Sequence, residues 1–263
     1  MIRLKTIKEI TERLTHVKEP ESWMEVLEQD SRTGVQNALS RWKRQYEKRK
    51  AIEHNHMLKE AFDRSYAPFE GALIAGVDEA GRGPLAGPVV TAAVILPRET
   101  PELIGLDDSK AISKAERERL AEQIKSVAIA YSAHIQSAHM IDDMNIYAAT
   151  RDSMEQAVEG LTVNPDFVIV DAMKLAVNCP TESVIKGDAL SLAVAAASII
   201  AKTTRDAIMD DLHNDFPMYN FKKNAGYGTG EHVLALQKHG PCEHHRTTFE
   251  PVKSMLDGGR KNR

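Results

Sequence analysis

The sequence predicts an α/β fold preceded by a small helical module. After about residue 68, apolar runs of strand length alternate with longer segments of helical period. Before that point, apolar residues recur at helical spacing, and residues 37–62 contain neither glycine nor proline. With 263 residues and 42% hydrophobic content, the chain can bury a full core in one large domain or two.

The helical module is predicted over residues 1–67. Its apolar side chains are spaced for one helix face: Ile7, Ile10 and Leu14, then Trp23, Val26 and Leu27. The sequence Tyr66-Ala67-Pro68 interrupts this pattern and marks the boundary.

Residues 68–257 form the predicted α/β domain, whose first two strands are expected to be a hairpin. Strands are predicted at Leu73–Asp78, Val89–Leu96, Val127–Ile135, Phe167–Val170 and Glu182–Ile185. Helices are predicted at Lys114–Lys125, from Asp142 to about Gly160, and from Asp188 to about His213. The basic, glycine-containing residues 258–263 are expected to be a disordered tail.

Composition excludes several classes of protein. A net charge of −4 argues against a generic nucleic-acid binder, and two cysteines, Cys179 and Cys242, are too few for a disulfide framework. The first residues lack the apolar core of a signal peptide, and no run approaches the ~20 apolar residues of a membrane span. We therefore expect a cytoplasmic protein with no membrane partner. A monomer is also expected.

Asp78 and Glu79 lie where an apolar run breaks into a loop rich in glycine and proline. Glycines allow a phosphate or sugar to approach the main chain, and Arg82 offers a planar fork for phosphate oxygens. Adjacent acids beside such a loop indicate a magnesium-dependent phosphodiester site. A tight turn capped by acids is the alternative. The P-loop and dinucleotide-binding motifs do not fit, because the first needs Gly-Lys-Ser/Thr and the second places its acid after the glycines.

The segment Asp78–Val89, Asp-Glu-Ala-Gly-Arg-Gly-Pro-Leu-Ala-Gly-Pro-Val, resembles the signature of the type II ribonuclease H family. The resemblance spans about residues 70–255. Further matching blocks follow in the family's order: Asp107–Lys110, Val170–Ala172, Lys186–Asp188, Ala195–Lys202, Gly226–Thr229, and His239–Gly240 through Glu243–Arg246.

The resemblance implies a ribonuclease H-like fold with a mixed central sheet, flanking helices and a helical C-terminal region. It implies an endoribonuclease that cuts 5′ to ribonucleotides in RNA–DNA hybrids or in duplex DNA with embedded ribonucleotides. Metal-assisted hydrolysis with Mg²⁺ or Mn²⁺ would leave 3′-hydroxyl and 5′-phosphate ends. A junction-resolving or strand-transfer nuclease on the same scaffold need not have the Gly-Arg-Gly and Gly-Tyr-Gly elements. A silent hybrid-binding protein would be expected to lack at least one acid.

The family pattern places Asp78, Glu79, Asp171 and Asp188 around the metals. Each has a structural alternative: Asp171 could start a turn and Asp188 could cap a helix. Glu79 would face away from Asp78 on a regular strand, unless the glycines that follow bend the chain.

Recognition of RNA depends on the 2′-hydroxyl, which main-chain groups of Gly81, Arg82 and Gly83 could bind. The resemblance implies that Tyr227 packs on the sugar at the RNA–DNA junction; a turn tyrosine without a partner is the alternative. Lys110, Lys202 and Arg205 are candidate phosphate contacts, with solvated surface charge as their alternative. Other polar groups are given structural roles: Asp142 and Asp143 cap a helix, Asp206 pairs with Lys202, and His244 and His245 pack or contact phosphate.

The stretch Arg41–Lys50 is strongly basic, with Trp42 and Tyr46 interleaved. It is either a solvated helix whose aromatic rings pack on the catalytic domain or a helix that adds phosphate contacts.

Overall fold

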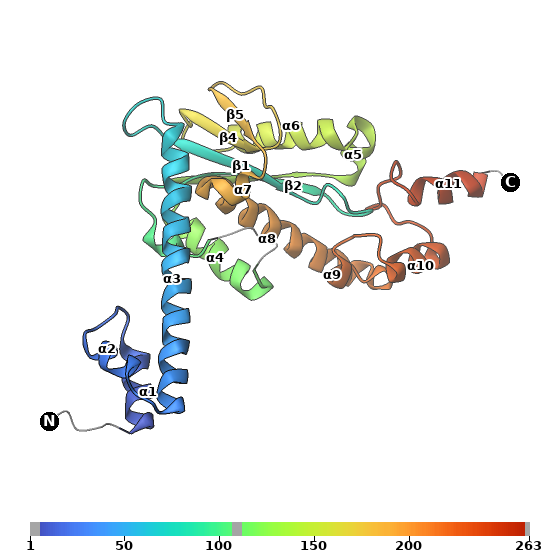
Figure 1. Ribbon diagram of the computed structural model, residues 1–263. Helices are drawn as coiled ribbons and strands as arrows, with labels where there is room; N and C mark the ends of the chain where they lie inside the picture. The colour runs from blue at the N-terminus through green and yellow to red at the C-terminus, as the bar shows by residue number, and fades with distance from the viewer. Residues whose placement is uncertain (1–5, 107–111, 261–263) are drawn as a thin grey trace. The chain divides into compact units, whose positions relative to one another are not determined.

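The computed structural model describes residues 6–106 and 112–260. It contains two compact units, Met1–Met57 and Leu58–Arg263, and helix α3 (Thr33–Ser65) contributes residues to both (Figure 1). The predicted domain boundary at residue 67 and the predicted tail from residue 258 stay predictions, although the backbone of α11 (Val252–Arg260) is helical to residue 260.

The N-terminal unit is a small helical module built from α1 (Ile7–His16), α2 (Trp23–Glu28) and the first part of α3. Thr6 and Glu9 form a capping box that fixes the start of α1. Trp42 lies inside this unit: its indole N–H donates to the carbonyl of Val17 at 2.9 Å, and Tyr46 stacks on its ring. The buried residues of the module are Ile10, Leu14, Met24, Leu27, Val35, Leu39 and Trp42.

The second unit is organised around one mixed five-stranded sheet, as the family resemblance implied. Its strand order is β3-β2-β1-β4-β5; β1, β2 and β3 pair antiparallel, whereas β4 and β5 continue parallel to β1. The strands are β1 (Ile74–Ala80), β2 (Val89–Ile95), β3 (Ala130–Gln136), β4 (Phe167–Asp171) and β5 (Thr181–Val184).

Helices cover both faces of the sheet, with α6 on one side and α4 and α8 on the other (Figure 1). Successive side chains of β2 point to opposite faces of the sheet, and both faces are apolar. Ala92 and Val94 pack with α4 and α8, whereas Ala93 and Ile95 pack with α6. The remaining helices are α4 (Lys114–Val127), α5 (Ala138–Met144), α6 (Ile146–Glu159), α7 (Gly187–Leu190), α8 (Leu192–Asp215), α9 (Phe221–Asn224) and α10 (Gly230–His239), with two short 3₁₀ turns at Pro101–Leu103 and Pro217–Tyr219.

Helix α8 lies unusually close to β1 because residue 76 is glycine. A Cβ at this position would lie only 2.1 Å from the main-chain carbon of Ala193. This close packing brings the middle of α8 over the carboxyl end of β1.

The boundaries of two predicted helices were wrong. The segment predicted to start at Asp142 is two helices, α5 and α6, separated at Asn145, whose positive φ of 71° ends α5 and whose side chain caps α6. Asp142 lies within α5 and accepts hydrogen bonds from Thr247 and Thr248. The helix predicted from Asp188 is likewise divided at Ser191, which caps α8 through the N–H of Val194.

Among the residues that the structure describes, no helix combines the length and the apolar character needed to cross a bilayer.

Candidate active site

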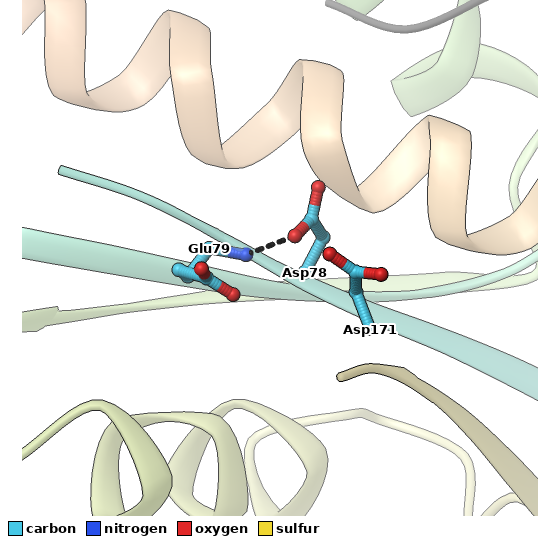
Figure 2. A group of neighbouring side chains, drawn as sticks. All are labelled: Asp78, Glu79 and Asp171. Atoms are coloured by element: carbon cyan, nitrogen blue, oxygen red, sulfur yellow. Dashed lines mark hydrogen bonds between the residues drawn. The ribbon is translucent and has the colours of Figure 1, made fainter. Parts of the chain in front are cut away.

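Three carboxylates meet at the carboxyl ends of two neighbouring parallel strands. Val77 of β1 is paired with Val170 of β4, so Asp78 and Asp171 follow side by side at the same edge of the sheet. One ligand oxygen from each of Asp78, Glu79 and Asp171 lies within 4.8 Å of the others. Figure 2 shows Asp78 and Asp171 pointing toward α8, and Glu79 on the other side of β1.

The surroundings of Asp78 disfavour the charged form of its carboxyl group. Its side chain is 5% exposed, and burial raises the pKa of the carboxyl well above its usual range. The negative charges of Glu79 and Asp171 raise this pKa further, while hydrogen bonds from Ser198 and from the N–H of Glu79, at 2.7 Å, partly offset the effect. A cation at this point would remove the repulsion.

Asp171 also holds the turn that carries Asp188. Its Oδ1 accepts the N–H of Gly187 at 2.7 Å, and Asp188 lies in the first turn of α7 that follows. The carbonyl of Asp188 accepts a hydrogen bond from Lys59, a fully buried lysine that sequence reasoning missed. Asp188 is thus held near Asp171 but outside the group of three carboxylates.

The loop from Gly81 to Pro88 packs against two distant segments, 225–227 and 244–246. The N–H of Leu85 donates to Gly226, and the N–H of Gly87 donates to His244. Tyr227 is 50% exposed, and a Cβ at Gly83 would lie 3.6 Å from its ring carbon Cε1. The Gly-Arg-Gly and Gly-Tyr-Gly elements therefore form one surface, where Arg82 is also exposed and 3.5 Å from Glu79.

Arg205 does not lie on this surface. It is 1% exposed and donates to three main-chain carbonyls, those of Ala86, Pro88 and Ala225, so the guanidinium is not accessible to a phosphate group. Arg246, which sequence reasoning did not single out, is also fully buried and donates to main-chain carbonyls of the Gly81–Pro88 loop. Burial lowers the pKa of Arg205 to about 10 and that of Arg246 to about 9, so both stay protonated at neutral pH.

The other predicted residues fall in three groups. Lys202 is partly exposed and bonds Asp206 at 2.5 Å, as the spacing of the two residues predicted. Lys110, Asp107 and Asp108 lie outside the described residues. His245 is buried, with its ring nitrogens 3.0 Å from His232 Nε2 and 3.2 Å from Cys242 Sγ, so it has a packing role.

Comparison with known families agrees with this geometry. The profile "Ribonuclease HII" matches residues 75–252, and the profile "Ribonuclease HII N-terminal domain" matches residues 6–67. The chain belongs to the ribonuclease HII family. It is 48% identical over 235 residues to ribonuclease HII of Halalkalibacterium halodurans, covering 89% of this chain and 88% of the relative. The protein of the same name from Enterococcus faecalis is 49% identical over 238 residues, covering 89% and 90%.

Solved structures show the same architecture. The ribonuclease H2 structure from Pyrococcus horikoshii matches with a TM-score of 0.63 and 26% identity, covering 72% of this chain and all of that one. The structure of Bst-RNase HIII in complex with Mn²⁺ matches with a TM-score of 0.57 at 16% identity, covering 76% and 73%, a likeness that concerns the fold alone.

Membership of the family defines the activity. The chain is a metal-dependent endoribonuclease that cleaves RNA in RNA–DNA hybrids and 5′ to ribonucleotides embedded in DNA.

Proposed function

We propose that Asp78, Glu79, Asp171 and Asp188 hold the catalytic divalent cation, Mg²⁺ or Mn²⁺, and that cleavage leaves 3′-hydroxyl and 5′-phosphate ends. The observation that carries this proposal is the group of three carboxylates within 4.8 Å. Such a group is unfavourable without a cation, because burial and two like charges already raise the pKa of Asp78.

The donor set fits a hard cation. All of the proposed ligands are carboxylates, which suit Mg²⁺ and Mn²⁺, whereas zinc sites usually recruit cysteine or histidine. The bound cation would supply charge stabilisation at the phosphate and a more acidic water. Asp171 is itself held by the N–H of Gly187, so one acid orients the turn that carries another.

Substrate choice is assigned to the surface formed by Gly81, Arg82, Gly83 and Tyr227. The two glycines leave the main chain open, so that N–H groups can bind the 2′-hydroxyl that distinguishes RNA from DNA. The half-exposed ring of Tyr227 beside Gly83 then packs on the sugar at the RNA–DNA junction. Lys110, Lys202 and the side chain of Arg82 are proposed phosphate contacts.

One cleavage assay tests these assignments together. A labelled DNA duplex with a single embedded ribonucleotide is incubated with Mg²⁺, with Mn²⁺ or with EDTA, beside an all-DNA duplex and a long RNA–DNA hybrid. We expect one cut 5′ to the ribonucleotide, a 3′-hydroxyl end that a polymerase extends, and no product in EDTA. Cleavage that persists in EDTA would contradict the metal site.

We further propose that the protein acts as a monomer on these duplexes. Sedimentation with the labelled duplex tests this, and a complex of two proteins per duplex would contradict it.

A further inference from the structure

Two buried arginines support the Gly81–Pro88 loop from inside the protein. Within the described residues, neither guanidinium is hydrogen-bonded to a carboxylate; both bind main-chain carbonyl oxygens instead. Arg246 donates to Gly81 at 2.5 Å, Arg82 at 2.8 Å and Gly87 at 2.9 and 3.2 Å, and Arg205 donates to Pro88 at 2.9 Å, Ala225 at 3.0 Å and Ala86 at 3.2 Å.

The contacts of Arg246 fix the direction of two peptide groups. In a trans peptide the C=O and the following N–H point in opposite directions. Because the carbonyls of Gly81 and Arg82 point inward to Arg246, the N–H groups of Arg82 and Gly83 point away from the buried guanidinium. Neither of these N–H groups has a hydrogen-bond acceptor among the described residues.

The same contacts strengthen these donors. A charged donor on a carbonyl polarises the whole peptide group, which makes the N–H on its other side a better donor. Two cations with little exposure lie under one loop, where water screens their charge poorly.

Arg205 ties this loop to the segment that carries Tyr227. It bonds Ala86 and Ala225 at once, and Gly81, with a φ of 99°, lets its side chain pass, since a Cβ there would lie 2.1 Å from Arg205 Nε. The N–H groups and the aromatic ring are therefore held by one pair of guanidinium groups.

We propose that Arg246 and Arg205 are positioning residues: Arg246 sets the Arg82 and Gly83 N–H groups for the 2′-hydroxyl, and Arg205 holds their loop against the segment that carries Tyr227. This inference rests on the proposed reading of the sugar by this surface. The arginines do not touch the substrate themselves; they determine how well the loop distinguishes ribose from deoxyribose.

The test compares Arg246→Lys and Arg246→Met with the wild type in the full chain. Lysine keeps the charge but cannot reach all of the carbonyls, whereas methionine keeps only the bulk. Met154→Ala, in the core that packs against the opposite face of the sheet, is the control for a general loss of stability. The readout is the Ki of an all-DNA duplex, as a competitor, divided by the KM for the single-ribonucleotide duplex.

We expect this ratio to fall about tenfold in Arg246→Lys, the loss that corresponds to about one hydrogen bond to the substrate, and further in Arg246→Met. The Mg²⁺ concentration at half-maximal rate and the Ki should stay as in the wild type. Amide exchange of Leu85 and Gly87, whose N–H groups are hydrogen-bonded in this loop, should become faster in both variants and stay unchanged in Met154→Ala.

A ratio equal to that of the wild type in Arg246→Lys would overturn the inference. If Arg246→Lys does not fold, Arg205→Lys answers the same question, and an unchanged ratio there has the same consequence. A fall of equal size in Met154→Ala would also overturn it. A wild-type ratio near one would overturn the sugar-reading proposal itself, and this inference with it.

Discussion

Asp78 is an acid whose position favours function over stability. Asp78→Asn keeps the shape of the side chain but removes the charge that holds a hard cation, so we expect cleavage to fall at least about a hundredfold. In EDTA the variant should melt no lower than the wild type, because burial and like charges already raise the pKa of Asp78 and disfavour its ionised form.

The matched control for this change is Asp211→Asn, an exposed acid on α8. It should keep both activity and melting temperature. Wild-type cleavage by Asp78→Asn with an unchanged Mg²⁺ dependence would contradict the metal site.

Tyr227 is a second single residue whose role can be tested, because its ring lies beside Gly83. Tyr227→Ala should lower kcat/KM on the single-ribonucleotide duplex roughly fivefold or more, since about 1 kcal/mol of ring contact is lost. Affinity for all-DNA duplex should change little. Tyr227→Phe separates the ring from its hydroxyl group and should retain most activity. Equal losses on both duplexes would make the ring a general contact.

At the scale of single elements, the start of α8 depends on an acid from the end of α3. Asp63 accepts the N–H of Ala193 at 2.9 Å, and burial raises the pKa of its carboxyl from 3.8 to about 6. A raised folded-state pKa means that the folded protein binds this proton more tightly than the unfolded chain. Asp63 therefore contributes stability that is complete below about pH 4 and is lost as the pH rises through about 6.

Asp63→Asn should abolish this pH dependence and raise the stability of the second unit at pH 7, by on the order of 2 kcal/mol. Asp166→Asn, another acid that accepts a main-chain N–H, is the control. Far-UV circular dichroism is the right measurement, because both tryptophans, Trp23 and Trp42, lie in the N-terminal unit. Stability of Asp63→Asn that follows the wild type between pH 4 and 7 would contradict the prediction.

Most strands and the acids at their ends could be predicted from sequence, because apolar runs and the polar residues that end them are local features. The parallel pairing of β1 with β4, which brings Asp78 beside Asp171, is a long-range contact that no local pattern encodes. The break at Asn145 was missed because it depends on a positive φ within a helical pattern. Arg205 and Arg246 look like surface charges in the sequence, and only the carbonyls that surround them explain their burial.

At the scale of the whole molecule, the basic stretch Arg41–Lys50 of α3 contains cations that are paired with acids and cations that are not. Lys43 pairs with Glu28, and Lys50 pairs with Glu19. Arg41, Arg44 and Lys48 are exposed, share one face of α3, and have no ion pair among the described residues. Trp42 packs in the core of the N-terminal unit, on a different side of α3 from these three cations.

We predict that replacing Arg41, Arg44 and Lys48 by glutamine weakens duplex binding and flattens its salt dependence. Each lost phosphate contact should lower the slope of log K against log salt by about 0.9. The cut position should not change. The double variant Lys43→Gln with Lys50→Gln is the control, because Lys43 and Lys50 are already paired with acids. An equal loss of slope per charge removed in both variants would show only an effect of net charge.

The contacts of helix α8 determine which changes of chain length the protein can accept. Its Ser198 hydrogen-bonds Asp78, and Arg205, about two turns later, donates to Pro88 at the end of the Gly81–Pro88 loop. An insertion of one residue between them would rotate the rest of the helix by about 100° and move it by about 1.5 Å, turning Arg205 away from its carbonyls. Substitutions on the outer face of this segment can be absorbed, but insertions and deletions cannot. The helix thus acts as a spacer of fixed length between the carboxylate group and the loop that we propose binds the sugar.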